Sequence, residues 1–208
     1  MSSHFHFQPE YSIRDSIVHR HVLCPDGVYW AVTDDFTDSA RNHCYATMLT
    51  NYLLFQQTES ARSTHADPAQ IRYLFRTVHS VSGNGPVFSV GRGSVRMLRD
   101  LGIRQDPAPI KKLRSRSGFR AAGAEHLSVS EIMYEKIRRR IDDGYPVALL
   151  VAAAPFDWHW VLAMGYAQAE YGRHFLLILD NWHRGGYQIY MPDDGCRLLS
   201  ATALPGRK

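Results

Sequence analysis

The sequence is poor in lysine and low in net charge, which argues against nucleic acid as a partner. Only four of its 24 basic residues are lysines, and the formal net charge is +4. So small an excess gives little of the electrostatic footprint that binds phosphate backbones. The two basic runs, residues 111–116 and 138–140, also lack interleaved aromatic residues on which bases could stack. We therefore expect these runs to be solvated surfaces or to steer an acidic ligand, and we predict no nucleic-acid partner.

Cysteines are few, and long hydrophobic runs are missing. Cys24, Cys44 and Cys196 cannot all pair within one chain, so the count indicates a reduced compartment and at least one free thiol. The longest apolar run, residues 146–156, is too short for the ~18 residues of a membrane helix. Residues 1–7 lack the basic region and apolar run of a signal peptide. We expect a cytoplasmic protein without a membrane span.

Against these shortages, the composition is that of a folded domain. Hydrophobic residues make up 45% of the 208 residues and charged residues 21%. These values and this length predict a single domain over residues 1–208 with a substantial core. We expect residues 1–23 to form an N-terminal arm that closes on this domain.

Hydrophobic periodicity divides the chain into a helical part and a strand-rich part. Apolar residues spaced three and four positions apart predict helices in the first two-thirds of the chain, at about 43–57, 67–78, 93–101 and 128–143. Short apolar or alternating runs predict strands at 28–32, 147–151, 159–166, 175–180 and 187–191. Residues 107–123 are poorly periodic and are expected at the surface. This segregation indicates an α+β fold, with N-terminal helices packed on a C-terminal antiparallel sheet.

Cys44 is the strongest candidate for a chemically active residue. It lies at the expected start of the first helix, where unpaired N–H groups and the helix dipole favour a thiolate. Asn42 precedes it as an N-cap or as an amide donor to an oxyanion. The alternative is that Cys44 is a small buried hydrophobic residue.

His159 and Asp180 are candidate partners of this thiol. If the turn between their strands is centred on residues 169–170, paired residue numbers sum to 339, and His159 faces Asp180. The carboxylate would then orient the imidazole, which would activate Cys44 and protonate the leaving amine. Alternatively, His159 is a core histidine and Asp180 caps the end of a strand.

The order of these residues resembles that of papain-like cysteine peptidases, and most closely the compact bacterial peptidases that process double-glycine leader peptides. Cys44 matches the nucleophile, and His159 matches the histidine that opens the segment 159–166. Asp180 matches the third member of the triad. Trp182 resembles the tryptophan that shields the site, although a packing role is the alternative. The resemblance implies a papain-like fold whose nucleophile helix packs on the sheet.

The chain departs from that family at two positions. Tyr45 follows the cysteine where the family usually has glycine, and Asp38 lies where a glutamine usually donates to the oxyanion. An ionised carboxylate is a poor donor, so Asn42 and the Cys44 N–H are the candidate substitutes.

These residues predict a cysteine peptidase or amide hydrolase that works through an acyl-thioester on a peptide or amide substrate. Two alternatives remain open: an acyltransferase or transglutaminase-like enzyme with the same triad, and a catalytically inactive descendant that binds a peptide. No metal or cofactor is predicted, because the histidine pairs lack ligand spacing and the glycine pairs lack a phosphate-loop lysine.

Overall fold

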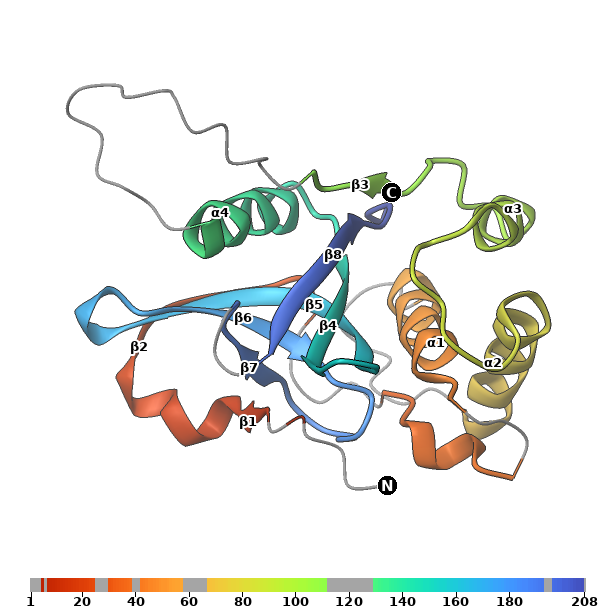
Figure 1. The fold of residues 1–208 in the computed structure, drawn as a ribbon, viewed down its shortest axis with the longest axis horizontal. Helices are drawn as coiled ribbons and strands as arrows, with labels where there is room; N and C mark the ends of the chain where they lie inside the picture. The colour runs from red at the N-terminus through yellow and green to blue at the C-terminus, as the bar shows by residue number, and fades with distance from the viewer. Residues whose placement is uncertain are drawn as a thin grey trace.

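The protein folds as four α-helices packed on an antiparallel sheet, within the residues that the structure describes (Figure 1). The structure is a computed structural model, and it describes residues 5, 7–24, 30–38, 42–57, 67–111, 129–192 and 196–207. The class is α+β, as predicted.

All four expected helices are present. They are α1 (Cys44–Gln57), α2 (Pro68–Ser82), α3 (Arg92–Asp100) and α4 (Val129–Asp142). α2 begins where the Asp67 carboxylate accepts the N–H of Ala69 at 3.0 Å, and it ends at Gly83, whose φ of 66° suits glycine. In α1 every residue from Tyr45 to Phe55 is buried, so α1 is the central helix of the fold. Three short 3₁₀ helices, Glu10–Ser16, Thr33–Phe36 and Glu170–Gly172, complete the described helical segments.

The described strands form one sheet in the order β1-β7-β6-β5-β4-β8-β3, and β2 pairs with β5 outside this path. Their bounds are β1 (Gln8–Pro9), β2 (Ile17–Val22), β3 (Ala108–Pro109), β4 (Val147–Ala154), β5 (Asp157–Ala169), β6 (His174–Leu179), β7 (Gln188–Tyr190) and β8 (Arg197–Ala203). β4 to β7 were expected from the sequence. The strand expected at 28–32 is wrong for residues 30–32, which are irregular, and residues 28 and 29 lie outside the described part.

Part of the expected N-terminal arm belongs to the sheet. β5 is long enough to pair with β4 along its first half and with β2 along its second half. β2 approaches closely at Gly165, where a Cβ would lie only 2.4 Å from the backbone oxygen of His21. Glycine is therefore required where the two strands meet.

The sheet separates two hydrophobic cores. The first core lies between the sheet and α1, α2 and α3, and it includes Trp160 and Leu162 of β5. The second core lies between the opposite face and α4, and it includes Val161 and Ala163. Alternate residues of β5 thus enter opposite cores, as expected for a strand that is covered on both faces.

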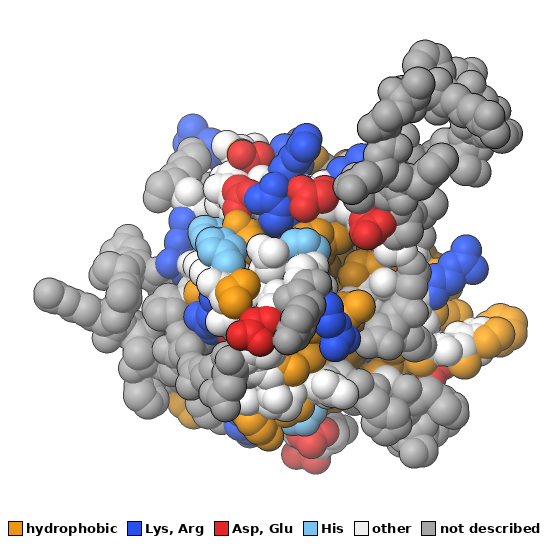
Figure 2. Space-filling model, turned by 90° about the vertical axis from the view of Figure 1, so that its left-hand side faces the viewer, with side chains coloured by type: hydrophobic (Ala, Val, Ile, Leu, Met, Phe, Trp, Pro, Cys, Tyr) orange, Lys and Arg blue, Asp and Glu red, His pale blue; other side chains and the backbone are white. Residues whose placement is uncertain are grey.

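The surface carries charges of both signs. On the face shown in Figure 2, Lys and Arg side chains lie beside Asp and Glu side chains, and histidines gather below them. Arg138 shows this mixing on α4, because it pairs with Glu135 at 3.0 Å and with Asp142 at 2.7 Å. In the described chain, no helix combines the length and the hydropathy that crossing a membrane requires.

Candidate functional site

Cys44 is the first residue of α1. The carbonyl of His43 accepts the N–H of Thr47 at 2.9 Å, which makes His43 the capping residue. The interpretation of Asn42 as the N-cap is therefore wrong by one position. Asn42 has an exposed side chain and a φ of 51°, in the left-handed region that asparagine tolerates. Its role as an oxyanion donor stays a prediction.

The Cys44 sulfur reaches the edge of β5. In an antiparallel strand, the N–H and C=O of one residue point to the same side. The carbonyl of Trp160 accepts Asn181 Nδ2 at 2.7 Å, on the side where β6 has already ended at Leu179. The Trp160 N–H points the same way and acts to lower the pKa of the Cys44 thiol. The backbone of β5 that influences the thiol is thus one residue from His159.

Burial of the Cys44 side chain raises the pKa of its thiol, and the N–H groups of Trp160, Tyr45 and Cys44 itself offset this only in part. The resting thiol is therefore protonated near neutral pH. The sequence-based expectation of a thiolate at this helix terminus does not agree with this direction, because desolvation outweighs the favourable backbone dipoles.

His159 is fixed by a carbonyl and by two aromatic rings. Its Nε2 lies 2.6 Å from the backbone oxygen of Asp180, and since a carbonyl only accepts, Nε2 carries the proton. Trp182 stacks on the ring at 3.9 Å between centroids and 9° between planes, and Phe5 lies 5.6 Å away. Nδ1 is left unprotonated, with no hydrogen-bond partner among the described residues.

Burial lowers the pKa of His159 to about 4, although the backbone oxygen of Asp180 and the charges of Asp180 and Asp157 act in the opposite direction. His159 is therefore neutral at pH 7. Its side chain leaves β5 on the face of the second core, because it lies opposite Val151 of that core. Cys44 packs against the first core, and no hydrogen bond joins its sulfur to the ring in the described structure.

The predicted hairpin register is wrong. Leu162 pairs with Leu179, so residue numbers sum to 341 rather than 339 there, and a bulge between Ala163 and Gly165 shifts the sum further. The cause is the 3₁₀ turn at Glu170–Gly172, which moves the centre of the hairpin along the chain. Continued toward His159, this register reaches Trp182, which explains the stacking of the two rings.

Asp180 contacts His159 through its backbone and uses its carboxylate elsewhere. Oδ1 accepts the N–H groups of Trp182 at 3.1 Å and His183 at 3.0 Å, while Oδ2 lies 2.6 Å from His183 Nδ1. The structure thus brings Asp180 to His159 but aims its carboxylate at His183. The three-residue spacing in a turn was the signal that could have identified His183 as its partner.

A buried amide network beside the site was missed by sequence reasoning. Asn51 donates to Asn181 Oδ1 at 2.9 Å and also exchanges hydrogen bonds with the backbone of Ala31 at 2.8 and 3.0 Å. Asn51 follows Cys44 by seven residues, so both lie on one face of α1. The network ties this face to the end of β5. An amide within an otherwise apolar helix face was its only signal.

Tyr45 is part of the core. Its hydroxyl donates to Ser94 Oγ of α3 at 2.9 Å, and its ring meets Trp160 edge-on at 5.2 Å. Burial raises the pKa of Tyr45 to about 12, so the hydroxyl stays protonated. The residue that replaces the family's glycine therefore joins α1, α3 and β5 in the first core.

Aromatic side chains gather at the start of β5. The ring centroid of Phe88 lies 5.0 Å from that of Trp158, and the ring centroid of Phe156 lies 6.3 Å from that of Trp158. Phe156 is 91% exposed and has a φ of 65°, an unusual conformation for a large side chain. Because Trp158 directly precedes His159, these three rings form an apolar patch next to the candidate site.

Comparisons of the chain with protein-family models, curated proteins and solved structures find no match. Among the described residues, no group of three or more His, Cys, Asp or Glu side chains is arranged to hold a metal ion.

Proposed function

We propose that the protein is a papain-like thiol hydrolase that cleaves an amide bond in a peptide, with Cys44 as nucleophile and His159 as general base. One observation carries this proposal. The N–H of Trp160 on β5 acts to lower the pKa of the thiol at the start of α1, and the preceding residue of the strand, His159, carries a buried, neutral imidazole whose Nδ1 has no hydrogen-bond partner among the described residues. A thiol and an oriented base are the parts that covalent acyl transfer requires.

The protonation states favour general-base catalysis over a preformed ion pair. Nδ1 of His159 takes the thiol proton as the Cys44 sulfur attacks the carbonyl carbon, and returns it to the leaving amine. Water then hydrolyses the acyl-thioester, and His159 again acts as base. The Asp180 carbonyl, 2.6 Å from Nε2, stabilises the transient imidazolium. Asn42 and the Cys44 N–H are the proposed oxyanion donors.

Cleavage of a synthetic peptide library, followed by mass spectrometry, tests the proposal. Wild type should give discrete products that Cys44→Ala abolishes. Cys196→Ala is the matched control, because it removes another thiol that is in no disulfide bond while leaving the site intact. Cleavage that persists in Cys44→Ala, or a wild type that cleaves no peptide, would count against hydrolysis.

The pH profile tests the assigned base. Because the pKa of His159 is lowered to about 4, kcat/KM should remain high down to about pH 5 and fall only below it. An acid limb near pH 6.5, the ordinary value for histidine, would show that His159 is not the base.

A second candidate is a non-catalytic descendant that binds a peptide at the same place. The raised pKa of Cys44 and the lack of a hydrogen bond from its sulfur to the His159 ring favour it. It predicts that library peptides bind equally to wild type and Cys44→Ala and are not turned over by either protein.

A further inference from the structure

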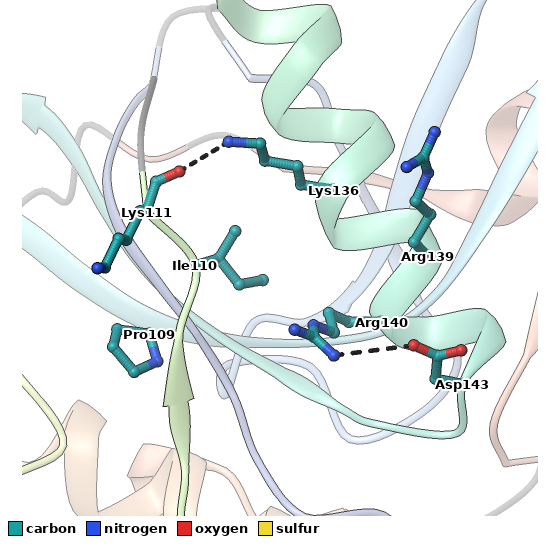
Figure 3. A pocket seen from close by; sticks show the side chains of 7 residues that line it. All are labelled: Pro109, Ile110, Lys111, Lys136, Arg139, Arg140 and Asp143. Carbon is teal, nitrogen blue, oxygen red and sulfur yellow. Dashed lines mark hydrogen bonds and ion pairs between the residues drawn. The ribbon is translucent and has the colours of Figure 1, made fainter. Parts of the chain in front are cut away.

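We propose that the protein binds a small organic phosphate in a hollow between β3 and α4, separate from the thiol site. The hollow has a volume of about 420 Å³, within the range of small-molecule sites (Figure 3). The residues at its wall include Lys111, Lys136, Arg139 and Arg140, together with one carboxylate, Asp143. We call this site the β3–α4 hollow.

The fold creates the hollow by bringing residues 109–111 beside α4. Ile110 is anchored to the sheet through its N–H, which donates to the Ala201 carbonyl at 2.9 Å. Lys136 of α4 then reaches across and donates to the Lys111 carbonyl at 2.9 Å (Figure 3). Segments 25 residues apart in the sequence are therefore joined at the wall of the hollow.

Helical spacing decides which side chains of α4 contribute. Lys136, Arg140 and Asp143 follow one another at four and three residues and lie on one face. Arg138 lies on another face, where Glu135 and Asp142 neutralise it and its guanidinium covers the Tyr166 ring at 5.7 Å. Arg138 thus has two acidic partners, whereas Asp143 is the one carboxylate that lines the hollow.

The charge of the hollow is left largely uncompensated. Arg140 meets Asp143 only at 3.8 Å, and Arg139 forms no ion pair among the described residues. Cations in the last turn of a helix also offset the helix dipole, which would account for the two arginines. It does not account for Lys111, which lies on the strand side, or for Lys136, two turns from the helix end.

The composition of the hollow selects the class of ligand. A guanidinium matches phosphate oxygens in a two-pronged geometry, and the lysines add point charges. A phosphate dianion offsets the net charge of the four cations and Asp143 better than a single carboxylate does. Pro109 and Ile110 add an apolar surface, so the ligand carries an organic group beside its phosphate.

Calorimetric titration with phenyl phosphate, inorganic phosphate and benzoate tests this proposal. Measurements at 0.15 M salt are suitable, because the Debye length of about 8 Å then screens remote charges. Phenyl phosphate should bind more tightly than the other two probes. Arg140→Gln should weaken it by about tenfold or more through loss of the two-pronged contact, and Arg140→Lys should restore part of the loss.

Arg76→Gln is the matched control, because it removes an exposed arginine from α2, a helix of the first core. It should leave phenyl phosphate binding unchanged, and unaltered thermal melting should confirm that each variant is folded. Equal weakening by Arg76→Gln and Arg140→Gln would show diffuse charge attraction and overturn the site. Absence of phenyl phosphate binding, or equal binding of inorganic phosphate or benzoate, would overturn the proposed ligand.

Discussion

Acidification should destabilise the protein through His159. The pKa of this histidine is about 4 in the folded chain and about 6.5 in the unfolded chain. As the pH is lowered below 6.5, the unfolded chain therefore binds a proton that the folded chain does not. The free energy of unfolding decreases as a result. Above pH 6.5 both states are neutral at this residue, and His159 adds no pH dependence.

The size of the effect follows from the two pKa values. Proton linkage gives a loss of about 2 kcal/mol at pH 5 and about 3 kcal/mol at pH 4, relative to pH 8. Because His159 is only 3% exposed, solvent screening reduces this little. Urea unfolding of wild type and His159→Gln between pH 4 and 8 measures this loss of unfolding free energy. Glutamine cannot bind a proton in this range, so the variant lacks the contribution of residue 159.

The difference in the free energy of unfolding between the two proteins should change by this amount across the range. His19→Gln removes an exposed histidine from β2 and should follow wild type. If wild type and His159→Gln lose stability in parallel, His159 is not held neutral by burial and the reasoning is refuted.

Three further substitutions test the geometry around the site. Asn51→Ala should lower the free energy of unfolding by roughly 2–4 kcal/mol in urea titrations, because it leaves several buried hydrogen-bonding groups unpaired. Gly165→Ala should lower the melting temperature and increase hydrogen exchange in β2, because the new Cβ meets the His21 backbone at 2.4 Å; unchanged exchange would contradict the close approach. Asp180→Asn should reduce kcat by less than about tenfold if the carbonyl orients His159, whereas a loss near 10⁴-fold would show that the carboxylate does so.

The parts of the fold that sequence reasoning found are those with a strong local pattern. The amphipathic spacing of α2 and the apolar run of β4 mark these elements directly. β2 was missed because its histidines and arginine interrupt the hydrophobic pattern, and β8 was missed because it is rich in small residues.

The contacts of the candidate site were harder to predict than its residue types. The segment order suggested Cys44, His159 and Asp180 as neighbours. The structure joins His159 to the backbone oxygen of Asp180, whereas Cys44 packs against the other core, and no hydrogen bond within the described residues links it to either. A 3₁₀ turn and one bulge then decided which part of Asp180 faces His159. The pairing of Asn51 with Asn181 joins residues 130 apart in the sequence, and no local pattern reports such a contact.

The position of β8 has a consequence for how the chain folds. β8 follows every other strand in the sequence, yet it pairs with β4, whose opposite edge holds β5 and His159. Until residues 197–203 pair with it, β4 has an unpaired edge along a strand rich in valine, leucine and alanine. Such an edge is a template for pairing with other chains. Folding intermediates that lack β8 should therefore aggregate, and chaperones that shield apolar edges should raise the yield of the folded protein.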